Sequence, residues 1–198
     1  SGPGMSGAES EESVNVEYGF RYLADDFSGE LIAFKSDYDN LLGRCRASDF
    51  DCQVGQEFSG GNAEVSGVEL TAQGQYELND VFLLTSQLNY TYSESEFKST
   101  FFSQFSQWGL VSKGDELPYI PKHTSSLKFG MESDQWGLDI AVKYQHGMRE
   151  TPGSSVSGEG LHTDKLTTID VSAVWFTNKD IDIKLLVRNI TDESAIVS

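Results

Sequence analysis

The chain has 198 residues, 38% apolar and 12% aromatic, which is enough for one domain with a sizeable core and excludes a disordered chain. Its formal net charge of −17 argues against binding to a nucleic-acid backbone. It contains no run of about 18 apolar residues, so we expect no transmembrane helix, while a membrane barrel of alternating strands stays open.

The start of the chain has neither the basic region nor the apolar stretch of a signal peptide. Residues 1–5 read as a scar left by cloning, and an acidic stretch follows them. We therefore expect residues 1–12 to be a scar and a loose lead, and residues 13–198 to form one folded unit.

Alternation of apolar and polar residues predicts about eight strands, because successive side chains of a strand point to opposite faces. The runs are 14–22, 30–38, the two halves of 65–92, 123–132, 136–145, 168–176 and 181–188. In the second run, Ile32, Phe34 and Tyr38 are predicted to lie on the apolar face. The pattern therefore indicates an all-β fold.

The stretch 65–92 is the clearest of these patterns and predicts a β-hairpin joined by a tight polar turn. Each half is about twice as long as an ordinary strand, and a tilted strand that crosses a bilayer needs roughly 9–11 residues. Its polar face carries Glu69, Gln73 and Gln87, which do not suit a dry core. That face would line a wet lumen, or face solvent around a soluble sandwich.

The connections between the predicted strands alternate regularly between short turns and long segments. The long ones are 39–62, 94–118 and 147–165, and the second of them is rich in aromatic residues and is expected to be partly ordered. Outer-membrane barrels have short turns at one rim and long loops at the other, whereas a Greek-key sandwich has no reason to keep this order. We therefore predict an antiparallel up-and-down meander of about eight long strands that is part of a transmembrane β-barrel.

Aromatic residues towards the strand ends fit the girdles that mark the membrane interfaces of such barrels. They are Tyr18, Tyr22, Tyr38, Tyr90, Tyr92, Trp136, Tyr144 and Trp175.

The two cysteines, Cys45 and Cys52, lie in the first long connection. No histidine is near them to complete a metal site, so a small disulfide loop in an oxidising compartment is the preferred interpretation, with two unpaired thiols as the alternative. Non-reducing peptide mapping should recover the two cysteines joined, and free thiols there would exclude the disulfide.

Four motifs of the chain resemble parts of one family of barrel proteins. Residues 38–43 (Tyr-Asp-Asn-Leu-Leu-Gly) are similar to the end of a barrel strand that runs into an outer loop, and residues 61–69 resemble the family's return strand. Residues 117–123 (Leu-Pro-Tyr-Ile-Pro-Lys-His) resemble the start of a late barrel strand. Residues 187–192 (Val-Arg-Asn-Ile-Thr-Asp) are similar to the penultimate strand. Together the four motifs resemble TonB-dependent outer-membrane receptors, and the resemblance is greatest to the ferric citrate receptor branch.

This resemblance implies an outer-membrane transporter that imports a ferric siderophore such as ferric citrate, and not an enzyme. The family's barrel has about 22 strands, so we expect this chain to be a C-terminal part of it, without the plug and the last strand. TonB would act through the absent N-terminal part, lipid would surround the barrel, and no cofactor is implied.

Cationic residues in or beside the long loops are the candidates for contacts with the ligand, because the resemblance implies an anionic iron complex and guanidinium groups match citrate carboxylates. These residues are Arg44, Arg46, Lys113, Lys122 and Arg149. Acidic residues of the first long connection match no calcium-binding spacing, so no metal site of the protein itself is expected.

Two other functions stay open from the sequence. One is a complete small eight-stranded outer-membrane barrel with an adhesive or structural role, which an even strand number permits. The other is a soluble β-barrel or sandwich that binds a small ligand. No catalytic constellation is evident, since the three histidines, His123, His146 and His162, are predicted to fall in different strands and loops.

Overall fold

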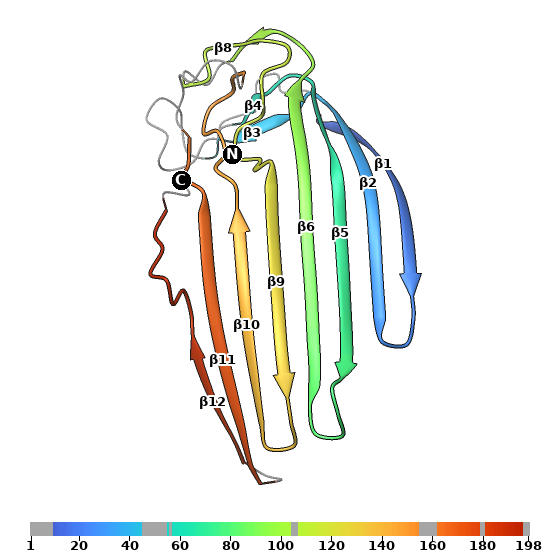
Figure 1. Cartoon of the computed structure of the whole chain (residues 1–198). Coiled ribbons are helices and arrows are strands. Elements are labelled where there is room, and N and C mark those ends of the chain that lie inside the picture. The colour runs from blue at the N-terminus through green and yellow to red at the C-terminus, as the bar shows by residue number, and fades with distance from the viewer. Residues whose placement is uncertain are drawn as a thin grey trace, which may run out of the picture.

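The computed structural model describes residues 10–44, 55, 57–103, 107–154, 162–178 and 181–195. Eight long strands form one antiparallel sheet in which each strand lies beside the next long strand along the chain (Figure 1). They are β1 (Glu12–Leu23), β2 (Phe27–Asp39), β5 (Ala63–Glu77), β6 (Leu83–Phe97), β9 (His123–Glu132), β10 (Trp136–Gln145), β11 (Leu166–Asn178) and β12 (Ile181–Val187). The predicted meander is therefore confirmed.

Two of the long connections also contain short paired strands. The first holds β3 (Leu42–Arg44) and β4 (Glu57–Ser59), and the second holds β7 (Phe101–Phe102) and β8 (Leu110–Val111). β6 continues to Phe97, five residues beyond the predicted hairpin, and so carries part of the aromatic segment. Figure 1 shows the long connections gathered at one end of the sheet and the short turns at the other.

The two faces of the sheet differ in polarity along its whole width. Directly paired residues share a face, and one row of pairs is apolar across four strands: it consists of Leu88, Leu127, Val142 and Ile169. The neighbouring row on the opposite face is polar and contains Gln87, Lys128, Ala141 and Asp170. The alternation predicted from the sequence therefore holds from strand to strand.

The apolar face is uncovered in the part of the chain that the structure describes. Leu31 is 48% exposed, Phe129 is 54% exposed and Leu185 is 64% exposed. Soluble monomers rarely expose a contiguous apolar surface of this extent. This face therefore requires lipid or further protein against it. No helix long and apolar enough to cross a bilayer occurs within the described ranges.

The predicted orientation of the second strand was wrong. Ile32 and Phe34 lie on the polar face, where Ile32 pairs with Glu69 and the Phe34 ring packs over Gly67. A Cβ on Gly67 would come within 2.8 Å of that ring, so the glycine leaves it room. Because Leu31 and Ala33 are also apolar, the sequence of β2 does not define its outer face, and its neighbours decide it.

Aromatic residues mark both ends of the apolar face. Trp136 pairs with Trp175 beside the short turns, and the ring centroids of Trp136 and Phe82 are 5.8 Å apart. At the other end, Tyr90 pairs with Ser125 and Ser125 pairs with Tyr144. Tyr38, which was predicted to belong to a girdle, packs against the apolar core under the long connections instead.

The buried apolar core of the described residues lies at the long-connection end and not between layers. It consists of Ala63, Phe97, Val111 and Leu117. The Phe97 ring is fully buried. Its centroid lies 5.6 Å from the ring centroid of Phe101 and 5.8 Å from that of Trp108. The second long connection therefore folds onto the ends of β5 and β6 as an ordered cap.

Candidate functional site: the polar face and the loop end

Ion pairs and hydrogen bonds connect the strands across the polar face. Lys128 Nζ lies 3.0 Å from Asp139 Oδ1, and Ser172 Oγ donates a hydrogen bond of 3.2 Å to Asp139 Oδ2. Lys143 Nζ lies 3.2 Å from Asp170 Oδ2. These lysine side chains are at least half exposed, so each pair contributes little to stability. The face is therefore a hydrated surface and not a packed core.

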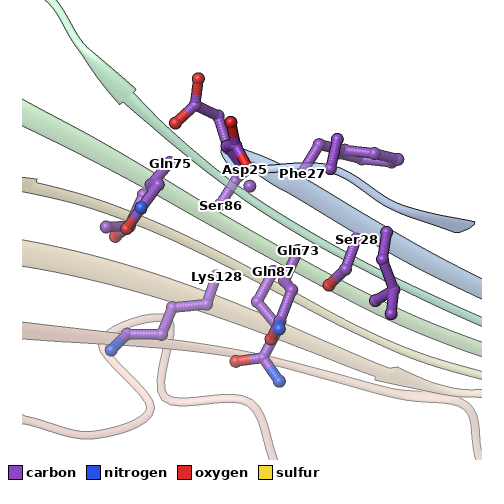
Figure 2. Close-up of a pocket in the computed structure, with 13 residues that line it drawn as sticks. Asp25, Phe27, Ser28, Gln73, Gln75, Ser86, Gln87 and Lys128 are labelled. Atoms are coloured by element: carbon purple, nitrogen blue, oxygen red, sulfur yellow. The ribbon is translucent and has the colours of Figure 1, made fainter.

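A polar hollow of about 610 Å³ lies where this face approaches the short turns. Figure 2 shows Gln73, Gln87 and Lys128 pointing to the same side of the sheet, and Asp25 is in the turn between β1 and β2. These side chains offer amide donors and acceptors and one cation. The hollow suits water or a polar segment of protein better than an apolar ligand.

The long connections after β6 and β10 are joined by backbone hydrogen bonds. Glu116 N donates to Gly153 O at 2.7 Å, and Tyr119 N donates to Arg149 O at 2.8 Å. Lys122 Nζ pairs with Glu116 Oε1 at 2.7 Å. Two of the predicted ligand residues, Lys122 and Arg149, are thus brought into one loop assembly.

Arg149 differs from the other candidates because its side chain is buried. It is 5% exposed, and Nε donates to Thr151 O at 3.2 Å while Nη1 donates to Ser154 O at 3.3 Å. A Cβ on Gly153 would collide with the guanidinium at 2.2 Å, so the loop closes tightly around it. In this conformation the buried Arg149 side chain stabilises the loop through its hydrogen bonds to the loop's carbonyl groups.

The other predicted residues have different positions. Lys113 is exposed in the second long connection, where its backbone N donates to Thr100 Oγ1 at 3.0 Å. The backbone of Arg44 pairs with Glu57, but its side chain, like Arg46 and the cysteines Cys45 and Cys52, lies outside what the structure describes. The predicted disulfide therefore stays a prediction.

A charged network borders the apolar face on the side of the long connections. Glu64 Oε2 lies 2.7 Å from Lys98 Nζ and 2.9 Å from Lys35 Nζ. The apolar part of β5 begins at Val68. Glu64 precedes Val68 by two positions on the same face of the strand, on the side of the long connections, so it lies outside the apolar part. The hydrogen bonds from Lys98 and then Lys35 lower the pKa of Glu64 to about 2.

This lowered pKa predicts acid sensitivity of the loop end. In the unfolded chain the carboxyl has its ordinary pKa of 4.5, so its stabilising contribution is complete above that pH and is lost as pH falls towards 2. Amide hydrogen exchange at Phe97 and Gly114 should accelerate between pH 4.5 and 2 after correction for intrinsic rates. The Glu64→Gln variant should lack this additional step, and an unchanged step in that variant would contradict the assignment.

Sequence reasoning missed a cluster where β9 begins and β10 ends, beside the middle of β6. Tyr90 Oη lies 2.9 Å from His123 Nδ1, and the ring centroids of His123 and His146 are 5.7 Å apart. These histidines were considered separately because they lie 23 positions apart in the sequence. The short turn at 133–135 contained the missing signal, because a hairpin centred there places residue 123 opposite residue 146.

Comparisons with known proteins agree with this geometry. The family model described as TonB dependent receptor-like, beta-barrel, matches residues 2–190. No match was found among the curated proteins with which the sequence was compared.

Solved structures share the fold at low sequence identity. The ferric yersiniabactin uptake receptor of Yersinia pestis superposes with a TM-score of 0.65 at 20% identity, over 92% of this chain and 25% of the receptor. The ferric-catecholate import receptor of E. coli K12 gives 0.66 at 19% identity, over 100% and 26%. A copper transporter gives 0.64 at 13% identity, over 97% and 27%. The chain thus spans about a quarter of the length of each.

Proposed function

Since this chain belongs to the TonB dependent receptor-like β-barrel family, we propose that it is a barrel segment of an outer-membrane receptor that imports a ferric siderophore. The observation that carries the proposal is the sheet with two unlike faces. Its exposed apolar face suits lipid, and its hydrated polar face suits the lumen of a barrel. The receptor is a transporter and not an enzyme, so this segment contributes binding and passage.

The open edges of the sheet support a larger barrel. β1 and β12 are the outermost strands and are not paired with each other in the described part of the chain. Unpaired edge strands can pair with further strands. This agrees with the comparison, in which the chain covers only about a quarter of the length of each solved receptor. Energy for import would reach the receptor from TonB through a part of the protein outside this sequence.

Ferric citrate is the ligand that we propose. Residues 38–43 and the cysteine-containing connection resemble the ferric citrate branch, and an anionic complex matches cations on the outer loops. Lys113, Lys122, Arg44 and Arg46 are the proposed contacts. Arg149 is proposed to act on the same ligand through the loop shape that its buried guanidinium maintains.

Uptake of radioactive iron by iron-starved cells of the source organism tests this function. Deletion of the gene should abolish uptake from ferric citrate and leave uptake from a ferric catecholate unchanged. Loss of catecholate uptake alone would refute the citrate assignment while keeping import. Uptake that is unchanged from every ferric complex would refute import itself.

One charge substitution refines the test. Replacing Lys113 with glutamate in the complete receptor should weaken ferric citrate binding about tenfold, because a hydrogen bond to a charged group contributes about 1.5 kcal/mol. Lys184→Glu is the matched control, since Lys184 lies in β12 near the short turns, where it pairs with Val174 of β11. Equal effects of the two substitutions would show that net charge, and not a contact of Lys113, governs binding.

The alternatives make different predictions about location and size. A complete eight-stranded barrel would be found in the outer membrane at about the 21.9 kDa of this chain. A soluble ligand-binding module would be found outside the membrane fraction. The proposed receptor would give a band several times larger in the outer membrane, raised by iron starvation.

A further inference from the structure

His123 and His146 form a direct cross-strand pair at the boundary between the apolar face and the long connections. The register of β9 and β10 ends with Thr124 opposite Gln145, and His146 N continues it by donating to His123 O at 2.8 Å. Both histidines have the same strand parity as Leu127 and Tyr144, so they occupy the apolar face. His146 is exposed and His123 is half-buried, so solutes from water can reach the pair.

In both histidines it is Nδ1 that lies within hydrogen-bond distance of a neighbouring oxygen atom, and Nε2 is the nitrogen left for a metal. His146 Nδ1 lies 2.7 Å from the carbonyl oxygen of Gly147, and a carbonyl can only accept, so Nδ1 carries the proton. His123 Nδ1 lies 2.9 Å from Tyr90 Oη. When Nδ1 donates to that hydroxyl, Nε2 of His123 keeps a free lone pair, as Nε2 of His146 does. Such an orienting partner on the second nitrogen is usual for metal-binding histidines.

We propose that His123 and His146 chelate one late first-row divalent cation through their two Nε2 atoms. With metal–nitrogen bonds of about 2.0–2.1 Å, two imidazoles on one square-planar or tetrahedral cation have ring centroids roughly 4.5–5.2 Å apart. The observed separation of the ring centroids is 5.7 Å, so the two rings must move closer together when the metal binds. Neutral imidazoles suit Cu²⁺, Ni²⁺ and Zn²⁺, and the general order of affinities puts Cu²⁺ first.

The surroundings of the pair favour a cation. The ring centroids of Tyr92 and His123 are 5.1 Å apart, so Tyr92 limits the movement of the imidazole. The Tyr92 hydroxyl donates a hydrogen bond to the carboxylate of Glu94. Glu94 adds negative charge beside the site, and the whole chain is acidic with a net charge of −17. Water would complete the coordination of a metal bound by two protein ligands.

Copper titration of the full chain in detergent micelles tests the proposal. Cys45→Ser and Cys52→Ser are included so that thiolates do not compete for the metal. Calorimetry with Cu²⁺ at pH 7.5 should give one tight site per chain, and the electron paramagnetic resonance spectrum should show coupling to two imidazole nitrogens. Absence of a tight site, or a spectrum without imidazole coupling, would overturn the proposal.

Substitutions of the three histidines assign the site. His123→Ala and His146→Ala should each weaken Cu²⁺ binding at least tenfold, because each removes one of two ligands. His162→Ala is the matched control and should bind as the parent does. Tyr90→Phe removes only the orienting hydroxyl and should weaken binding by about tenfold. Unchanged affinity in both His123→Ala and His146→Ala would refute the site, and circular dichroism verifies that each variant keeps its β-structure.

This inference is independent of the proposed import of a siderophore. The pair lies on the apolar side of the sheet, whereas the proposed import path lies on the polar side. Failure of copper binding would leave the transport proposal intact, and failure of iron uptake would leave the metal site intact.

Discussion

Leu70→Arg is expected to reduce the free energy of unfolding of the complete receptor in phospholipid vesicles by about 2–4 kcal/mol. Leu70 is at the middle of β5, on the apolar face, where it pairs with Leu31 and Tyr90. A lipid-facing arginine near the bilayer midplane has a cost of this size. Urea titration with tryptophan fluorescence measures the change.

Thr71→Arg is the matched control, because the same side chain is introduced one position further along the same strand. Thr71 lies on the polar face between Glu30 and Asn89, where it is exposed. An arginine there meets water and a carboxylate, so we expect a change within about 0.5 kcal/mol. Equal destabilisation by the two substitutions would show that the two faces do not differ in environment.

Phe97→Ala is expected to destabilise the cap formed by the second long connection by about 3–5 kcal/mol, the usual cost of removing a fully buried aromatic side chain. The Phe97 ring is 0% exposed and packs edge-on against Phe101 and Trp108. Protection from amide hydrogen exchange should fall in residues 98–117 while the middle of β6 keeps its protection.

Phe102→Ala provides the control for this effect, since Phe102 is 79% exposed in the same connection. Its removal should change exchange very little. If Phe97→Ala left protection of residues 98–117 unchanged, the apolar cluster would not be what orders the cap.

The long strands could be predicted because their sequence pattern matches their geometry. β9 and β10 begin and end at the predicted residues, since alternation is strict on both sides of a short polar turn. β2 shows the limit of this reasoning. Leu31 and Ile32 are neighbours, so periodicity does not decide between the two faces, and the register with β1 and β5 does.

The loop end was less predictable because its order depends on tertiary contacts. Phe97, Val111 and Leu117 are distant in the sequence and meet only when the connection folds back. The burial of Arg149 depends in the same way on carbonyl groups of its own loop. The register of a hairpin, by contrast, is readable from its turn, so the His123 and His146 pair was within reach of sequence reasoning.

In the assembled barrel one face of the sheet should contact lipid and the other should contact water. Nitroxide labels placed singly from Leu84 to Tyr92 along β6 measure this difference in the complete receptor in membranes. Collision with oxygen, which concentrates in lipid, and with a water-soluble nickel chelate should alternate with a period of two. Labels at Leu84 and Leu88 should favour oxygen, and labels at Thr85 and Gln87 the chelate. Equal access of the chelate to both sets would contradict a membrane-spanning sheet.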